Sequence, residues 1–254
     1  MGAGHSHALY VHEHSPLHRM APEAKIVGAL VSVACIALTP REAIWAFAVY
    51  ATLIVALVVI SRVSPGFLLL RLVAVAPFVL FALFIPFIAS GEKTEIWGVP
   101  VSVDGLWGAW NVLAKALLGA SVSIVLTATT EIADILRGTG VLRVPVLFTS
   151  IAMFMIRYLE LIVDELRRMR VAMASRGFEP RWLNQARPIA SSAGALFVRS
   201  YERGERVHSA MLARGFTGTM PTLGQRRARP AEWLSVASIT ALFLMVLVVA
   251  MVKT

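Results

Sequence analysis

Long apolar runs constrain this chain more than any other feature. Residues 43–60, 67–89, 106–129 and 233–252 each form a run long enough to cross the roughly 30 Å hydrocarbon core of a bilayer as a helix. Residues 26–38 are only 13 residues long, and we expect a short or tilted helix there that forms a hairpin with the next run. Of all residues, 57% are hydrophobic and 15% are charged, against about 25% charged in a soluble domain. The sequence therefore predicts an all-α integral membrane protein with about five transmembrane helices.

Prolines and polar residues mark where these runs bend and where they are joined. Pro77 and Pro86 should kink the third run. Arg71 and Lys115, inside apolar runs, are expected to snorkel or to contact other helices. A substrate pathway is the alternative role for both. Residues 90–104 are expected to form a loop, and the acidic balance of that loop suits the non-cytoplasmic side.

The positive charge of the chain is confined to one block. Residues 137–229 contain 16 arginines, no lysine and six carboxylates, a net charge of +10, whereas the rest of the chain has a net charge of −1. An excess of Lys and Arg marks cytoplasmic segments of membrane proteins. The expected organisation is a cytoplasmic His-rich head (1–24), transmembrane helices 1–4 (25–136), a cytoplasmic coupling domain (137–229) and a C-terminal transmembrane helix (230–254).

Two long amphipathic helices are predicted within this block. Apolar residues recur every three or four positions over residues 148–173, and the opposite face is charged and includes an Asp164–Arg168 pair. A proline-containing link at 179–188 precedes a second apolar face over residues 193–211. Helices of this kind lie on the bilayer surface or against each other, and the sequence leaves both arrangements open.

The two amphipathic helices end in a repeated motif. Residues 172–178 (Ala-Met-Ala-Ser-Arg-Gly-Phe) align without a gap with residues 210–216 (Ala-Met-Leu-Ala-Arg-Gly-Phe), and five of the seven positions are identical. Glycine at this place permits the left-handed conformation that ends a helix. The arginine before it complements the negative helix terminus and offers five fixed donors to a partner. One copy would indicate only a glycine-capped helix, whereas two matched copies favour a shared function.

A polytopic chain with two such motifs resembles the transmembrane coupling (T) component of energy-coupling-factor importers, ATP-driven uptake systems related to ABC transporters. The resemblance implies that each motif docks into a groove on one of two cytoplasmic ABC-type ATPase subunits. Carried over to this chain, the docking positions are Ala174, Arg176, Gly177, Ala213, Arg214 and Gly215. Ser175 departs from the family pattern, which leaves open which small residue of the first motif packs in the groove.

The same resemblance implies partners, substrate and location. Residues 14–25 look like the N-terminus of the cobalt-system members called CbiQ, while nickel and a vitamin are alternative substrates. A separate membrane subunit would bind the substrate, and ATP and Mg would be held by the ATPases, so no cofactor is expected on this chain. The expected location is the bacterial cytoplasmic (inner) membrane, with the lipid bilayer around a multi-pass protein.

Five of the six histidines fall in the first 18 residues. His-x-His occurs twice, at His5 and His7 and at His12 and His14. Imidazole suits Co(II), Ni(II) and Zn(II), so such a tail could gather metal near a transporter. A solvated polar tail with incidental histidines is the alternative, because no cysteine or paired carboxylate completes a four-ligand site there.

The sequence contains no signature of a catalytic site. It has no Walker A sequence, no Gly-x-Ser-x-Gly elbow and no His-Glu-x-x-His. We therefore expect a non-catalytic transporter subunit whose partners hydrolyse ATP. Two rival classes are a basic membrane-anchored binder of anionic lipid or nucleic acid and a membrane enzyme. The repeated motif favours the coupling role over both, with no nucleic acid as a partner.

Overall fold

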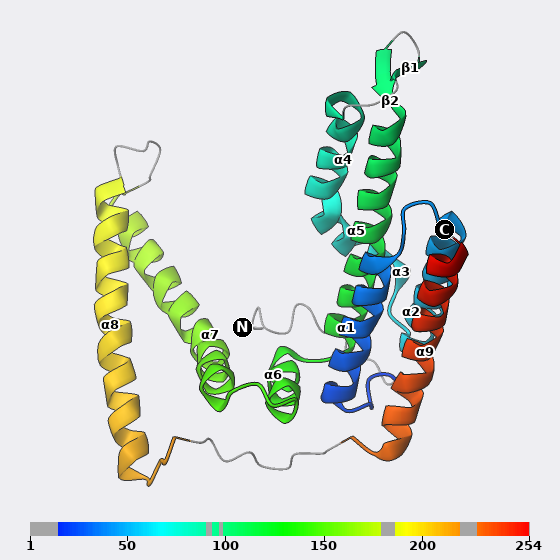
Figure 1. Cartoon of the computed structure of the whole chain (residues 1–254). Coiled ribbons are helices and arrows are strands. Elements are labelled where there is room, and N and C mark those ends of the chain that lie inside the picture. Colours follow the sequence, from blue (N-terminus) through cyan, green and yellow to red (C-terminus); the bar gives the residue numbers. More distant parts are fainter. Residues whose placement is uncertain (1–14, 90–92, 97–98, 179–185, 219–227, 254) are drawn as a thin grey trace. The chain divides into compact units, whose positions relative to one another are not determined.

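The computed structural model describes residues 15–89, 93–96, 99–178, 186–218 and 228–253, and these residues form a mostly helical protein (Figure 1). They fall into two compact units. We call residues 15–142 and 228–253 the bundle, and residues 143–218 the arm.

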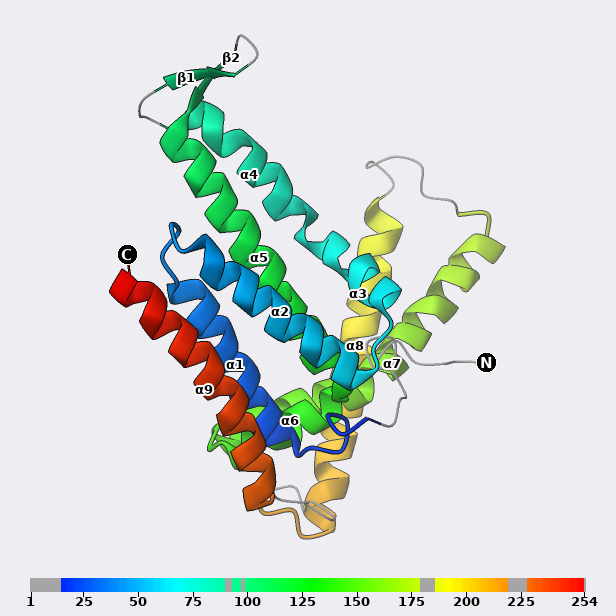
Figure 2. The same cartoon turned by 90° about the vertical axis from the view of Figure 1, so that its right-hand side faces the viewer.

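The bundle consists of helices and one short hairpin, which lies at the adjoining ends of α4 and α5 (Figure 1). Its elements are α1 (Pro22–Leu38), α2 (Ile44–Ser61), α3 (Pro65–Leu72), the 3-10 helix η2 (Val73–Val75), α4 (Ala76–Ile88), β1 (Lys93–Ile96), β2 (Val99–Ser102), α5 (Val103–Thr129), α6 (Ile132–Val141) and α9 (Pro230–Lys253). Helix α1 packs against α5, α6 and α9, and α4 packs against α5 (Figure 2). In the core, the rings of Tyr50 and Phe243 stack 5.2 Å apart, and the Tyr50 hydroxyl donates to the Phe243 carbonyl at 3.2 Å.

Five helical segments are long and apolar enough to cross a membrane: Ile44–Ser61, Pro65–Ile88, Val103–Thr129, Val146–Ser175 and Pro230–Lys253. Large apolar side chains point outward from the bundle, and Ile88 and Val252 are 79% and 80% exposed. Such surfaces need lipid to cover them. The chain is an all-α integral membrane protein that passes the cell membrane several times.

The five segments are not the same five that the sequence suggested. The first run forms α1, which begins four residues earlier, at Pro22, and has 17 residues, or about 25 Å of helix. It is shorter than the five listed segments, whereas α7 (Val146–Ser175) of the arm joins them. The reason lies in the composition of α7, because residues 146–156 carry no charge and all its charged residues lie from Arg157 onward.

The predicted kink of the third run is confirmed at Pro77. The run is interrupted by η2, and α4 then starts with Pro77 in its first turn, where a missing N–H costs nothing. Pro86 lies inside α4, which continues as a helix to Ile88.

The loop expected at 90–104 contains an antiparallel hairpin instead. Lys93 pairs with Ser102, and Ile96 pairs with Val99. β-branched residues alternate through both strands, which favours extended backbone. The acidic composition alone did not indicate this.

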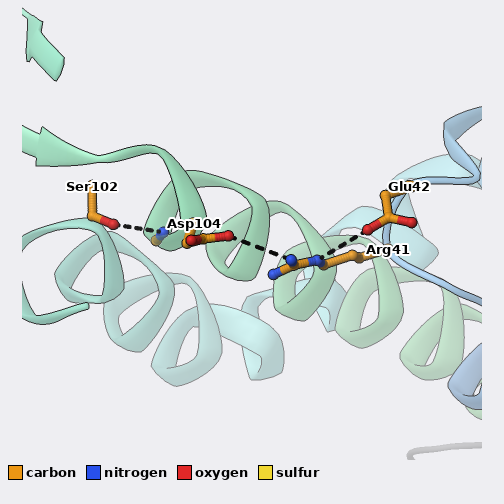
Figure 3. A network of polar contacts seen from close by, with 5 residues as sticks. Arg41, Glu42, Ser102 and Asp104 are labelled. Carbon is orange, nitrogen blue, oxygen red and sulfur yellow. Dashed lines mark hydrogen bonds and ion pairs between the residues drawn. The ribbon is translucent and has the colours of Figure 1, made fainter. Parts of the chain in front are cut away.

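A polar network joins the hairpin's end to the turn between α1 and α2 (Figure 3). The Ser102 hydroxyl caps α5 by accepting from the Gly105 N–H at 3.3 Å. One residue into that helix, Asp104 accepts from the Arg41 guanidinium at 3.4 Å, and Arg41 also lies 3.5 Å from Glu42. These groups are exposed, so each pair contributes at most about 1 kcal/mol.

Two lysines of the bundle donate to carbonyls at the ends of helices. Lys25 Nζ donates to the carbonyl of Thr129, the last residue of α5, at 2.8 Å, and Lys115 Nζ donates to the Ala37 carbonyl near the end of α1 at 2.6 Å. The last four carbonyls of a helix have no partner within it, and a cation there is favourable. The prediction that Lys115 contacts another helix is therefore confirmed.

The first turn of α1 holds the segments through which the chain leaves and re-enters the bundle. The buried Glu23 carboxylate accepts from the Ala228 N–H at 2.6 Å, just before α9. A Cβ on Gly138 of α6 would lie 3.0 Å from the Glu23 nitrogen, so α6 lies directly on this turn. With Lys25 bonded to the end of α5, the first turn of α1 is a junction for α5, α6 and α9.

The close approach of α4 and α5 depends on Gly105. A Cβ there would lie 2.6 Å from the Pro86 Cα, so Gly105→Ala must push two backbones apart, at about 1–3 kcal/mol. We expect the purified chain to melt at a lower temperature in detergent. Gly119→Ala, on the same helix with no atom within 4 Å of the added Cβ, is the control and should melt no lower than the parent. Equal melting of the two variants would contradict the packing.

Removal of the Lys25 ammonium should loosen the junction. Lys25→Met leaves the Thr129 carbonyl without its donor at a buried position, which costs about 1–3 kcal/mol. We expect faster amide exchange in α6 and at the end of α5. Lys115→Met removes the same kind of bond from a less buried lysine and should leave α6 protected. Unchanged exchange in Lys25→Met would show that the junction does not depend on this bond.

Candidate functional site

The arm is an antiparallel pair of helices, α7 (Val146–Ser175) and α8 (Ala186–Ala213) (Figure 1). Arg199 of α8 donates to the Glu165 carboxylate of α7 at 2.5 Å, and the Ser192 hydroxyl lies 3.4 Å from the Met173 sulfur. Of the two arrangements that the sequence left open, the helices contact each other.

Two details of the arm differ from the sequence-based expectation. Arg168 makes its close ion pair with Glu165, at 2.7 Å, while Asp164 lies 3.9 Å from Arg167 and attracts Arg168 from farther away. The Glu165 carboxylate is less exposed than that of Asp164 and also pairs with Arg199 of α8. It therefore forms the closer ion pair with Arg168. The predicted link at 179–188 is shorter at its end, since α8 begins at Ala186. Pro188 then lies in the first turn, where proline is tolerated.

The first repeated motif forms the end of α7, which we call the first tip (residues 172–178). Gly177 has a φ of +75°, in the left-handed region. Its N–H donates to the Ala174 carbonyl at 2.9 Å, and the N–H of Phe178 donates to the Met173 carbonyl at 3.0 Å. This pair of bonds is the Schellman motif, which satisfies carbonyls that the helix itself leaves unpaired.

The second repeated motif forms the end of α8 in the same way, and we call it the second tip (residues 210–216). Gly215 has a φ of +81°. Its N–H donates to the Leu212 carbonyl at 3.0 Å, and the N–H of Phe216 donates to the Met211 carbonyl at 3.0 Å. Position by position, the two tips share both hydrogen bonds and the sign of φ, so the repeat in sequence is also a repeat in backbone structure.

Both tips present the same side chains outward. All six residues carried over as docking positions are exposed, whereas the Met and Phe of each tip are half-buried: Ala174, Arg176, Gly177, Ala213, Arg214 and Gly215 against Met173, Phe178, Met211 and Phe216. Within the residues that the structure describes, neither the Arg176 nor the Arg214 guanidinium has a hydrogen-bond or ion-pair partner. Each tip therefore offers an exposed planar cation, unpaired among the described residues, on a capped helix end.

The tips lie at opposite ends of the pair, because α7 and α8 run in opposite directions (Figure 2). They do not form one composite site. Any partner that engages both must reach two separate places, or two partners must bind one tip each.

The histidines proposed for metal capture, His5, His7, His12 and His14, lie outside the described residues. Among the residues described from 15 onward, no group of three or more His, Cys, Asp or Glu is arranged to hold a metal ion. The described member of the head, His18, has its Nδ1 2.7 Å from the Ser15 hydroxyl, within one turn before α1.

Comparison with known proteins places both tips within one family. The family model CbiQ, described as "Cobalt transport protein", matches residues 13–223. The chain belongs to the CbiQ family. The match includes the junction on α1, the arm and both tips.

Individual relatives of this CbiQ-family chain carry two kinds of name. The energy-coupling factor transporter transmembrane protein EcfT of Streptococcus thermophilus is 24% identical over 92% of this chain and 94% of its own length. The cobalt transport protein CbiQ of Rhodobacter capsulatus is 28% identical over 52% of this chain and 54% of its own. The putative fused cobalt transport protein CbiMQ of Methanocorpusculum labreanum is 26% identical over 81% of this chain and 36% of its own. The chain is thus a transmembrane component of an energy-coupling factor transporter.

Sequence reasoning found the tips but missed the junction at the start of α1. Glu23 and Lys25 looked like the end of a polar head, yet both are buried. Pro22 at the first helical position was the available signal, since it indicates that the helix begins before the apolar run does.

The left-handed glycines should hold the tips in place. An alanine at φ near +80° is strained by about 1–2 kcal/mol, so Gly177→Ala and Gly215→Ala should each fray the last turn of their own helix. Hydrogen exchange should become several-fold faster over residues 173–178 in the first variant and 211–216 in the second. Gly194→Ala, inside α8 with open space around the added Cβ, is the control and should not speed exchange at either tip. Unchanged exchange in both tip variants would contradict this role of the glycines.

Proposed function

We propose that this chain is the energy-coupling subunit of an ATP-driven importer, and that one cytoplasmic ABC-type ATPase docks on each tip. The supporting observation is the repeated backbone of the tips, with the same two hydrogen bonds, left-handed glycine and exposed arginine in both copies. Two equivalent contacts suit a pair of similar motor subunits. An arginine fork and a bare glycine fit a groove that supplies carboxylates or carbonyls and admits close backbone approach.

In this proposal the chain transmits motion and carries out no chemistry. ATP binding brings the two ATPases together, and each takes one tip with it. The Schellman bonds make each tip move as part of its helix, and the Glu165–Arg199 and Met173–Ser192 contacts couple α7 to α8. A membrane subunit that binds the substrate then changes its access to the two sides.

Cobalt is the proposed substrate of the assembled importer. The names of the relatives from Rhodobacter capsulatus and Methanocorpusculum labreanum support cobalt. The match to the EcfT protein of Streptococcus thermophilus covers more of that relative's length, but its name states no metal. Nickel and a vitamin are the alternatives. Uptake of radioactive cobalt and, separately, of radioactive nickel by cells that express the importer distinguishes among the three: preferred uptake of cobalt supports the proposal, preferred uptake of nickel supports nickel, and uptake of neither leaves a vitamin.

The location of the arm is part of the proposal. We place it at the cytoplasmic face, because the block that contains it has the arginine excess of a cytoplasmic segment. This places α7 outside the hydrocarbon, with its uncharged residues 146–156 available for contacts to the membrane interface or to protein.

Reversal of the tip charges tests the docking. In Arg176→Glu and Arg214→Glu, a free cation at the proposed contact becomes an anion, and we expect at least about tenfold less ATPase to co-purify with the tagged chain from its native membrane. Arg206→Glu, an exposed arginine of α8 outside the tip that lies 3.8 Å from Glu202, is the control for charge reversal on the arm and should retain the ATPases. Membrane insertion should be normal in all three. Normal ATPase recovery and normal uptake in both tip variants would refute the docking.

A further inference from the structure

A groove of about 670 Å³ lies beside the second tip, within the arm. Phe154, Arg157 and Tyr158 of α7 form one side, and the second tip forms the other with Arg214 and Phe216 among its lining residues. We call this the tip groove. The second tip is therefore not an isolated helix end but one wall of a shaped surface.

The tip groove exists because the two helices of the arm are joined unevenly. Toward the first tip they touch directly, through Ser192 against Met173 and Arg199 against Glu165. From the Met173–Ser192 contact to the Glu165–Arg199 contact, the residue number on α7 decreases by eight and that on α8 increases by seven. The same alignment continued along the pair brings Phe154 opposite Met211, and there the tip groove lies between the helices.

The side chains of the tip groove are those of a protein interface. The rings of Phe154 and Tyr158 stack with centroids 6.3 Å apart, which holds both in place. Met211 and Phe216 are half-buried on the opposite side. Aromatic residues, methionine and arginine are the residue types enriched at protein–protein contacts.

The charge of the tip groove is unbalanced. Arg157 and Arg214 are both exposed, and neither guanidinium has a hydrogen-bond or ion-pair partner in the part of the chain that the structure describes. None of the described Asp or Glu residues lines the tip groove. A partner that fills it must bring its own negative charge, and planar guanidinium groups match carboxylates in a two-pronged contact.

We infer that the tip groove receives a carboxylate-bearing segment of the ATPase that docks on the second tip, with Arg157 as a second cationic contact beside Arg214. The inference rests on the proposed function and adds α7 to the docking surface. The second tip then holds its ATPase through two arginines from two helices.

The experiment uses a chain whose first tip is disabled by Arg176→Glu, so that binding through the second tip is measured alone. The probe is the ATPase that co-purifies with the unmodified chain, titrated onto the tagged chain in phosphatidylcholine nanodiscs. In this background Arg157→Glu should weaken binding at least about tenfold, and Arg157→Lys should weaken it less, because a lysine keeps the charge and loses the fork. Arg170→Glu, an exposed arginine of α7 outside the tip groove with no ion-pair partner among the described residues, is the control and should bind like the parent.

The outcomes separate this inference from the proposed function. If no ATPase co-purifies with the unmodified chain, the proposed function fails. If ATPase binds the parent and Arg157→Glu equally well, the tip groove is not part of the docking surface and the inference is overturned while the function stands. The inference is also overturned if the Arg157 effect occurs only when phosphatidylglycerol is added to the nanodiscs, or if Arg157→Glu keeps the ATPase and releases a membrane subunit instead. Arg157→Gln serves as the second variant should the reversal disturb folding.

Discussion

In hydrocarbon a backbone N–H or C=O has no water to bond, so a chain that crosses the membrane must satisfy its backbone within helices. Charged side chains in the bundle can then find backbone partners at the places where other helices end. The bundle shows this: Lys25 and Lys115 donate to carbonyls at the ends of α5 and α1, and Glu23 accepts an N–H just before α9. The tips of the arm follow the same rule outside the bundle, with backbone bonds in place of lysines. The contacts of these three side chains and the capping bonds of both tips all lie at helix ends.

This arrangement relates the two units of the chain. The segment that leads to the arm begins at the end of α6, and the segment that returns from the arm ends at α9. Both α6 and the residue just before α9 contact the first turn of α1. Within the bundle, these places are held by a junction that contains a buried lysine and a buried glutamate. Within the arm, direct contacts between α7 and α8 lie toward the first tip, and the tip groove lies toward the second.

Much of this could be predicted from the sequence. Apolar runs gave the helices, and seven aligned residues gave both tips, because a glycine in the left-handed region is needed wherever a helix must end in this way. What the sequence could not give depends on contacts between distant residues. The sequence placed Glu23 and Lys25 at the end of a polar head, whereas in the structure α6 and α9 cover both side chains. The pairing of Glu165 with Arg199 rather than only with its own helix follows from the approach of α8. The charged residues in and around 93–102 led to the prediction of a loop there, whereas the structure contains a hairpin.

Docking of both tips on motor subunits is tested most directly by photo-crosslinking in the native membrane, with a photoreactive amino acid in place of Ala174 or Ala213. Both positions are exposed, one on each tip. Crosslinks from both positions to ATPase subunits, lost when ATPase is absent from the cell, are the expected result. Adducts only to lipid, or only to proteins on the outer face, would show that the tips do not engage a cytoplasmic motor.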